Sequence, residues 1–255
     1  MIKIICPECN RQFSGTEYNR SKFCPDCGKY LQQVKVPDPE PPHPPPSGPL
    51  PLSPDDAYIF KLWPVYMKSS IKVSAGYKFS SVEEWVKMRK QVYSLYRSKF
   101  SPDNLQNLEK TKQSFYSWLL FKNNLSWTTL QRTASTALDH PLSLANLLLK
   151  LQDEDIDLAS RVRFALQGPG RISGIGQGIV TALLHTFNDE QYGVWNSRTA
   201  DTLRKLHEQI FPSDDLGETY LRVNGTLHKI AKQVDSDLTT VDGFMWFVSK
   251  NYKFL

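Results

Sequence analysis

The chain has 255 residues, of which 40% are hydrophobic and 12% aromatic, so it is long enough for one large core or two unequal domains. Its 31 Lys and Arg residues against 26 Asp and Glu residues give a net charge of +5, which permits an anionic partner but does not require one. The sequence contains no run of about eighteen apolar residues that would span a bilayer, and its beginning lacks the apolar core of a secretory signal. We therefore expect a cytoplasmic protein with no membrane partner, associated with the nucleoid if its source is bacterial.

All four cysteines precede residue 28 and form two Cys-x-x-Cys pairs. Each pair can coordinate one metal ion, because its two thiolates are separated by two residues. A proline stiffens the turn between the two cysteines of each pair. In a reducing compartment such pairs favour a metal over disulfides. The sequence predicts a small ribbon over residues 1–35 with one structural zinc, and a rubredoxin-like iron site is the alternative. The expected ligands are Cys6, Cys9, Cys24 and Cys27.

Residues 36–55 hold ten of the seventeen prolines of the chain. Proline fixes φ and has no backbone N–H, so this segment favours extended polyproline II over helix or sheet. We interpret it as a stiff linker between two domains. A ligand for an aromatic groove of another protein is the alternative interpretation.

From residue 56 to the end, apolar residues recur at spacings of three and four, which predicts an all-α domain over residues 56–255. Ser81 and Glu84 form a capping box at the start of one helix. The apolar stripe expected to follow it consists of Trp85, Met88, Val92 and Leu95. Leu142 to Leu151 is so rich in leucine that we expect it to be buried on most sides and to form the central helix. Further helices are expected over Pro102–Phe121, Ile156–Leu166, a short stretch ending near Phe187, a stretch capped by Ser197, Leu216–Val234 and Asp237–Val248.

The chain reads Gly-Ile-Gly-Gln-Gly from Gly174 to Gly178, between two of these helices. Glycine permits a tight turn with positive φ, and the next helix begins with N–H groups that no helical carbonyl accepts. These N–H groups and the positive end of the helix dipole suit a phosphate, which they can hold without reading a base. A tight turn packed inside a helical bundle is the alternative. The candidate phosphate-binding positions are Gly174, Gly176, Gln177 and Gly178.

This helix, glycine turn and second helix resemble the helix-hairpin-helix DNA-binding motif. Over residues 110–250 the pattern is similar to the helix-hairpin-helix DNA glycosylases typified by endonuclease III. The resemblance implies an all-α glycosylase-like bundle, here preceded by the zinc ribbon and the proline-rich linker. It also implies a double-stranded DNA partner and a role in DNA repair or, as in glycosylases that excise modified phage bases, in antiviral defence. No cysteine follows Cys27, so we expect no iron–sulfur cluster.

In that family a catalytic aspartate opens the helix that follows the second helix of the hairpin, about twenty positions after the last turn glycine. Twenty positions after Gly176 stands Asn196, which has no charge to stabilise a cationic sugar but can position a water. Asp201 lies about one helical turn further on and can supply a carboxylate, although a first-turn residue that favours the helix dipole is the alternative. Bifunctional members carry a lysine where this chain has Gln177, so we expect no Schiff base and no lyase activity. The predicted catalytic residues are Asn196 and Asp201.

The polar turn with which the family enters the duplex corresponds to Asn123 and Asn124, and a capped loop between two helices is the alternative. Three cations beside the two DNA-facing turns are expected to contact phosphates, and a solvated surface charge is the alternative for each; they are Lys122, Arg171 and Arg198. Base flipping needs an aromatic slot to offset unstacking. The aromatic residues predicted to stack on a flipped base are Trp127, Tyr192 and Trp195, whereas Trp118 and Trp246 are expected in the core.

The predicted function is that of a monofunctional DNA glycosylase, a hydrolase that flips a modified base and cleaves its N-glycosidic bond. The first alternative is a non-catalytic helix-hairpin-helix module, to which the zinc ribbon adds a second contact with DNA or with a protein partner. A third interpretation makes the ribbon and the proline-rich segment the functional part, with the helical domain as a protein-interaction scaffold.

Overall fold

The structure is a computed structural model that divides the chain into two compact units, Met1–Pro51 and Leu52–Leu255. Helices dominate the described part of the second unit, which confirms the predicted all-α class. Among the described residues, no helix is long and apolar enough to cross a bilayer. The residues whose structure is described are 2–5, 12–13, 32–35, 54–72, 78–125, 134–206 and 213–251.

The first unit contains a three-stranded antiparallel sheet in the order β2-β1-β3. Strand β1 (Ile2–Ile5) pairs with β2 (Gln12–Phe13) and with β3 (Gln32–Lys35), and Ile4 lies opposite Phe13. The four cysteines fall in the two connections between these strands, outside the described residues. Within the described residues, no three His, Cys, Asp or Glu side chains are placed to hold a metal ion. Zinc ligation by the cysteines therefore stays a prediction.

The described residues of the second unit form a succession of helices with one small pair of strands. Its helices are α2 (Pro54–Met67), α3 (Val82–Lys99), α4 (Pro102–Leu105), α5 (Leu108–Leu125), the 3-10 helix η1 (Ser135–Asp139), α7 (Pro141–Gln152), α8 (Leu158–Leu166), α9 (Gln177–Phe187), α10 (Ser197–Lys205), α11 (Leu216–Gln233) and α12 (Leu238–Asn251). The two-residue strands β4 (Ile71–Lys72) and β5 (Lys78–Phe79) pair antiparallel. Pro54, expected in the linker, is instead the first residue of α2, a helix position that tolerates proline well.

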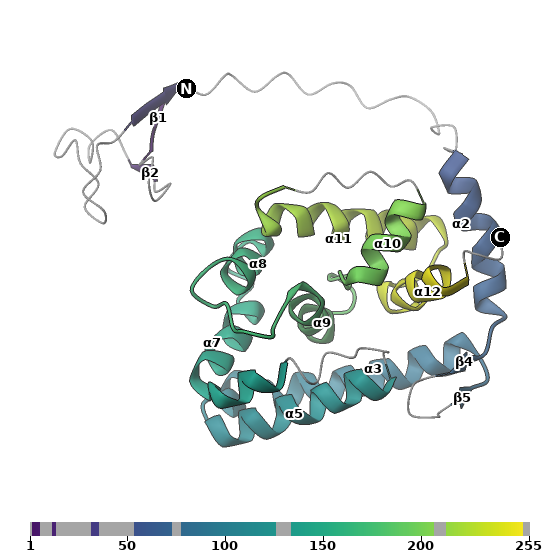
Figure 1. Cartoon of the computed structure of the whole chain (residues 1–255), viewed down its shortest axis with the longest axis horizontal. Helices are drawn as coiled ribbons and strands as arrows, with labels where there is room; N and C mark the ends of the chain where they lie inside the picture. Colours follow the sequence, from purple (N-terminus) through teal and green to yellow (C-terminus); the bar gives the residue numbers. More distant parts are fainter. Residues whose placement is uncertain are drawn as a thin grey trace. The chain divides into compact units, whose positions relative to one another are not determined.

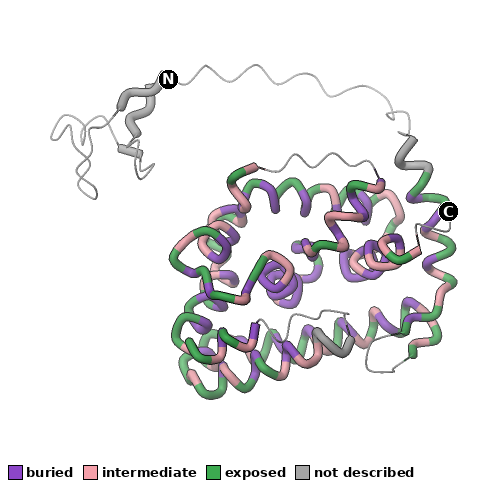
Figure 2. The backbone as a smooth tube through the Cα atoms, viewed as in Figure 1, coloured by how far each residue is buried: buried purple, intermediate pink, exposed green. Residues whose placement is uncertain are grey.

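Helix α9, not α7, lies at the centre of this unit (Figure 1). Every residue of α9 from Ile179 to Thr186 is buried, and Figure 2 shows this stretch in one colour. The prediction that the leucine-rich helix is buried on most sides was wrong for α7, because Leu142 is 61% exposed and Leu149 is 36% exposed. Apolar composition did not reveal the central helix because α9 fills its buried face partly with threonine and histidine, whose polar atoms are hydrogen-bonded internally.

The buried face of α3 differs from the predicted apolar stripe. Leu95 is 50% exposed, whereas Arg89 and Tyr93 lie on the buried face. Arg89 Nη1 pairs with Asp242 Oδ2 of α12 at 2.6 Å. The Arg89 guanidinium also lies 4.7 Å from the ring centre of Trp85 and 5.2 Å from that of Tyr93. These contacts compensate the burial of a cation, which apolar spacing could not indicate.

Candidate nucleic-acid interface

The connection from α8 to α9 is a tight turn anchored by two apolar side chains. Ile172 and Ile175 are both buried, and Ile175 N donates a hydrogen bond to Ile172 O at 3.0 Å. Between them, Gly174 has a φ of +82°, which lies in the left-handed region that strains any residue with a side chain. The glycine therefore lets the chain reverse while both isoleucines stay in the core.

Helix α9 begins without a side-chain cap. Its N-cap residue is Gly176, and no side chain there accepts a hydrogen bond from the first turn. Gly176 is exposed, and a Cβ added to it would meet no atom within 4 Å. Its φ of −97° suits any residue, so the backbone does not require glycine at this position. Ile179 N already donates to Gly176 O at 3.0 Å. The bare glycine therefore leaves the N–H groups of Gln177 and Gly178, at the positive end of the helix dipole, open to an external anion.

Helix α10 begins beside α9 and is capped by its own chain. Thr181 Oγ1 of α9 accepts a hydrogen bond from Trp195 N at 2.9 Å, which brings the start of α10 against α9. The next residue, Asn196, is the N-cap, and its Oδ1 accepts hydrogen bonds from two first-turn N–H groups at 2.9 and 3.0 Å. The prediction that Ser197 caps this helix was wrong, because Asn196 has the extended backbone and the amide oxygen that reach both N–H groups.

Its role as a cap limits what Asn196 can do chemically. Two N–H groups occupy Oδ1, so the end of the amide left for a partner is Nδ2, which can only donate. A donor can orient a water or a phosphate oxygen, but it cannot remove a proton. The geometry thus favours a structural or anion-contacting role for Asn196 over a role as general base.

Asp201 and Asn196 are not brought together. Asp201 lies five residues after Asn196, which places it about 140° away around the helix axis. The Asp201 carboxylate pairs with Lys205 Nζ at 2.9 Å and with Arg204 Nη1 at 3.5 Å, both on the same helix. Its side chain is 41% exposed, so these are surface pairs along one face of α10.

Two of the three aromatic residues predicted to stack on a base are buried. Trp195 is 7% exposed and stacks on Tyr220, with ring centroids 6.4 Å apart and an interplanar angle of 20°. Tyr192 is 5% exposed, and its hydroxyl accepts a hydrogen bond from Arg161 Nη2 at 2.9 Å. In this geometry both rings pack between helices. Trp127 lies outside the described residues, so its role stays a prediction.

The two described cations predicted to contact DNA differ in their surroundings. Arg171 is exposed in the turn before Gly174. Arg198 is half-buried, with its guanidinium 5.9 Å from the ring centre of Trp246 and its Nη1 buried without a hydrogen-bond partner. Burial lowers the pKa of Arg198, and no carboxylate of the described residues pairs with it. A partly desolvated guanidinium at the positive start of a helix is unfavourable alone and suits an anionic partner.

The other predicted DNA-facing turn begins later than the sequence suggests. Helix α5 continues to Leu125, so the backbone of Lys122, Asn123 and Asn124 is helical. Their side chains lie outside the described set, as do residues 126–133. Contact of these residues with DNA therefore stays a prediction.

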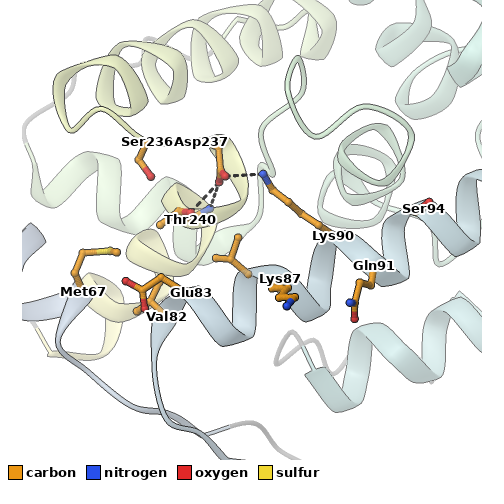
Figure 3. Close-up of a pocket in the computed structure, with 11 residues that line it drawn as sticks. Met67, Val82, Glu83, Lys87, Lys90, Gln91, Ser94, Ser236, Asp237 and Thr240 are labelled. Atoms are coloured by element: carbon orange, nitrogen blue, oxygen red, sulfur yellow. Dashed lines mark hydrogen bonds and ion pairs between the residues drawn. The ribbon is translucent and has the colours of Figure 1, made fainter.

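A groove of about 720 Å³ lies between α3 and the turn from α11 into α12 (Figure 3). Lys90 Nζ and Asp237 Oδ2, both lining it, pair at 2.7 Å. Burial alone would raise the pKa of Asp237, but hydrogen bonds from Lys90 and Thr240 outweigh it and hold the pKa below its ordinary value. None of the residues lining this groove comes from α9 or α10, so it is not a base pocket beside Asn196.

A smaller groove of about 350 Å³ lies between the end of α2, strand β4 and the end of α12. Trp246 lines it together with polar side chains such as Ser69 and Asn251. The guanidinium of Arg198 lies over the ring of the same Trp246. The groove therefore shares a residue with the surroundings of α10, and its volume lies within the range of small-ligand sites.

Sequence reasoning missed two buried polar side chains that shape this region. Thr181 bonds to the backbone of Trp195, as described above. Asn224 of α11 accepts a hydrogen bond through Oδ1 from Gly193 N at 2.6 Å, and its Nδ2 donates to Gln191 O at 2.9 Å. A polar residue on the buried face of a helix is the signal that would have identified both, because such a residue needs an internal partner.

Comparisons with known proteins give no family assignment. No family model matches the chain, and neither curated proteins nor solved structures yield a match.

Proposed function

We propose that the second unit is a helix-hairpin-helix domain that binds double-stranded DNA through phosphate contacts at the start of α9. The observation that carries this proposal is the uncapped helix start at Gly176, where a Cβ would meet no atom within 4 Å. A DNA phosphate supplies the acceptor that the first turn lacks, and it does so without any reading of bases. The net charge of +5, the exposed Arg171 and the unpaired Arg198 support an anionic partner.

The test is a binding titration of the full chain with a duplex of mixed sequence at salt concentrations between about 50 and 200 mM. We expect affinity to fall steeply with salt and to depend little on sequence. Arg171→Gln should reduce the slope of log affinity against log salt by about one. Lys61→Gln removes the same charge from the exposed face of α2 and should leave the slope unchanged. Absence of salt-dependent binding would refute the proposal.

Base excision is the second candidate function, and one observation favours it. The groove of about 350 Å³ that Trp246 lines lies beside Arg198, where it could receive a base extruded from the duplex. Water would attack the sugar carbon, the N-glycosidic bond would break, and the base would leave with a proton. Gln177 offers no amine for a Schiff base, so this reaction would leave the strand uncut. Asn196 Nδ2 could orient the water, whereas Asp201 is held in surface pairs.

Duplexes that carry a panel of modified bases, followed by heating in alkali, separate the two functions. A non-catalytic module gives no strand break with any base, whereas a glycosylase gives breaks at the abasic sites. Asn196→Asp restores the carboxylate of the family and keeps a good N-cap residue. Breaks with this variant alone would show that the pocket is present and that only the chemistry has been lost. Loss of breaks in Asp201→Ala would show that its carboxylate acts in the reaction.

For the first unit we propose one structural zinc held by Cys6, Cys9, Cys24 and Cys27. In support, one cysteine pair precedes β2 and the other precedes β3, so each pair falls in a connection of the antiparallel sheet. Such connections are where zinc knuckles place two thiolates on one ion. Elemental analysis of the purified chain should find one zinc per molecule, and Cys9→Ser should lower this content. Iron in place of zinc would support the rubredoxin-like alternative.

A further inference from the structure

Helix α9 carries a histidine that is fully buried and has a partner at each ring nitrogen. His185 Nδ1 lies 2.5 Å from Tyr192 O, and His185 Nε2 lies 3.2 Å from Thr239 Oγ1 of α12. A backbone carbonyl oxygen only accepts hydrogen bonds, so Nδ1 must carry a proton and act as the donor. The neutral ring is therefore the Nδ1–H tautomer, whose Nε2 can only accept a hydrogen bond.

The hydroxyl of Thr239 has one proton and two acceptors within reach. Its Oγ1 lies 3.2 Å from Asp189 Oδ2 as well as 3.2 Å from His185 Nε2. While His185 is neutral, the hydroxyl is the group that can donate to Nε2. When Nε2 takes up a proton, it donates to Oγ1 instead, and the hydroxyl then donates to Asp189. The same three side chains therefore form a complete set of hydrogen bonds to a charged ring.

The carboxylate at the end of this chain of hydrogen bonds is buried. Asp189 is 7% exposed, and its Oδ1 pairs with Arg97 of α3, whose own side chain is 42% exposed. A buried cation is costly unless a negative charge nearby compensates it. Through Thr239, a protonated His185 has such a charge two hydrogen bonds away. Solvent screens its repulsion from Arg97 because that guanidinium reaches the surface.

The other titratable groups around His185 keep their charge where histidine titrates. Tyr93 of α3 meets the His185 ring edge to face, with centroids 5.1 Å apart, and burial raises the pKa of Tyr93, so it stays neutral. Acidic and basic side chains ordinarily stay charged between about pH 5 and pH 8, whereas histidine does not. The charged side chains next to these residues are Arg89 and Asp242 near Tyr93, Lys90 and Glu190 near Asp189, and Arg161 and Glu154 beside Tyr192.

We infer that His185, Thr239 and Asp189 form a buried pH-responsive switch, in which the Thr239 hydroxyl changes its acceptor when His185 takes up a proton. The switch lets the core accept a proton without unfolding. It does not depend on the proposed DNA binding. Because Asp189 and Tyr192 both belong to the connection from α9 to α10, protonation acts on the segment that leads to Asn196 and the start of α10.

The tautomer is tested on the unmodified chain by NMR of ¹⁵N-labelled histidine. At about pH 8, above the ordinary titration of histidine, we expect a proton on Nδ1 of His185 and none on Nε2. Acidification should then add a proton to Nε2 while the chain stays folded. The signals are assigned by replacing the other four of the five histidines in turn, which leaves the switch intact. A proton on Nε2 alone at about pH 8 would overturn the inference, as would a ring that takes up no proton before the chain unfolds.

Thr239→Val removes the hydroxyl and keeps the shape of the side chain. It should move the midpoint of the His185 titration to lower pH by about one unit, because a charged N–H without an acceptor costs more in the core than a neutral nitrogen without a donor. Thr239→Ser keeps the hydroxyl and should restore the midpoint. If Thr239→Val does not fold, the measurements on the unmodified chain still decide.

Thr202→Val is the matched control. Thr202 is also fully buried, and its Oγ1 donates to Met245 O of α12 at 2.8 Å. Its loss should lower the melting temperature by a similar amount at every pH and leave the His185 midpoint unchanged. The cost of Thr239→Val should instead grow as pH falls below about 6.5, because the unfolded histidine then binds a proton that the folded variant resists. Equal midpoints in wild type and Thr239→Val, or equal pH dependence of the two variants, would overturn the inference.

Discussion

Helices α9 and α10 begin close together, but they differ in whether a side chain accepts hydrogen bonds from the N–H groups of the first turn. At α10, the amide oxygen of Asn196 accepts hydrogen bonds from two first-turn N–H groups. At α9, Gly176 provides no side chain, and the space beside it is empty for 4 Å. Both residues have an extended backbone, so either position would accept a capping residue. The difference therefore lies in the side chain alone.

The packing of the two helices explains why the chain can leave α9 uncapped. A glycine at the N-cap in place of a capping side chain costs about a few tenths of a kcal/mol, which a helix buried along its length can offset through its packing. Every residue from Ile179 to Thr186 is buried, whereas α10 has nine residues and buries only three of them. Helix α10 therefore depends more on its cap, and α9 can keep its first N–H groups free for a partner.

Gly176→Asp should have the largest effect, and it should act in opposite directions on stability and on binding. An aspartate there can cap α9 and add a negative charge at its positive end, which stabilises the fold by roughly 0.5–1 kcal/mol. The same carboxylate occupies the proposed phosphate site, so duplex affinity should fall by more than about tenfold, or 1.4 kcal/mol. Thermal unfolding and fluorescence anisotropy on the same samples measure both quantities.

Gly176→Ala is the control for this change, because a methyl group fits the empty space without supplying a carboxylate. It should alter affinity only slightly and should lower the melting temperature, because alanine is a poorer N-cap residue than glycine. An aspartate variant that binds DNA as tightly as the wild type would mean that the start of α9 makes no phosphate contact.

Features set by residues near one another in sequence could be predicted. Ser81 Oγ accepts a hydrogen bond from Glu84 N at 3.2 Å, so this half of the predicted capping box is confirmed. The turn around Gly174 also lies where the glycines indicated, with α9 beginning directly after Gly176. In each case a few adjacent residues determine the backbone conformation, because caps and turns depend on local side chains and on permitted φ values.

Features set by distant partners could not be predicted. Arg89 is buried because of Asp242, which lies 153 positions away. Trp195, predicted to face a base, is instead buried against Tyr220. The error in the cap of α10 has a similar origin, since Thr181 holds Trp195 N from another helix and so helps to place Asn196 at the N-cap. Periodicity records which face of a helix is apolar, but not which polar groups find partners in the core.

Asn196→Ala should have the next largest effect, and it should act on stability rather than on binding. Loss of the cap should lower the free energy of unfolding by about 1 kcal/mol, measured by urea denaturation. Asn196→Asp should match or slightly exceed wild-type stability, because a carboxylate also caps and favours the helix dipole. Duplex affinity well below the melting temperature should change far less in Asn196→Ala than in Gly176→Asp. Equal losses of affinity would contradict the distinction between a capped and an open helix start.

A third helix start, that of α11, is capped by a charge. Asp215 Oδ1 accepts hydrogen bonds from the N–H groups of Gly217 and Glu218 at 2.9 and 3.2 Å. Its Oδ2 accepts one from Arg163 Nε at 2.8 Å, and the bond with Arg163 is the main cause of a pKa for Asp215 below its ordinary value. Since the folded pKa lies below the unfolded one, the contribution to stability is present above about pH 4 and is lost as pH falls through the folded pKa.

Asp215→Asn should have the smallest effect, and this effect should depend on acid. The amide still caps α11 but lacks the charge, so the free energy of unfolding should fall by roughly 0.5 kcal/mol at neutral pH, a small value because the pair is partly exposed. Urea denaturation at several pH values should show this difference from wild type closing below about pH 4, whereas the cost of Asn196→Ala should persist, because an amide does not titrate. A constant cost of Asp215→Asn would show that the charge contributes nothing. At neutral pH, a carboxylate neutralises the positive end of α11 and an amide occupies the first N–H groups of α10, so α9 is the one of these three starts whose backbone N–H groups can still bind a phosphate.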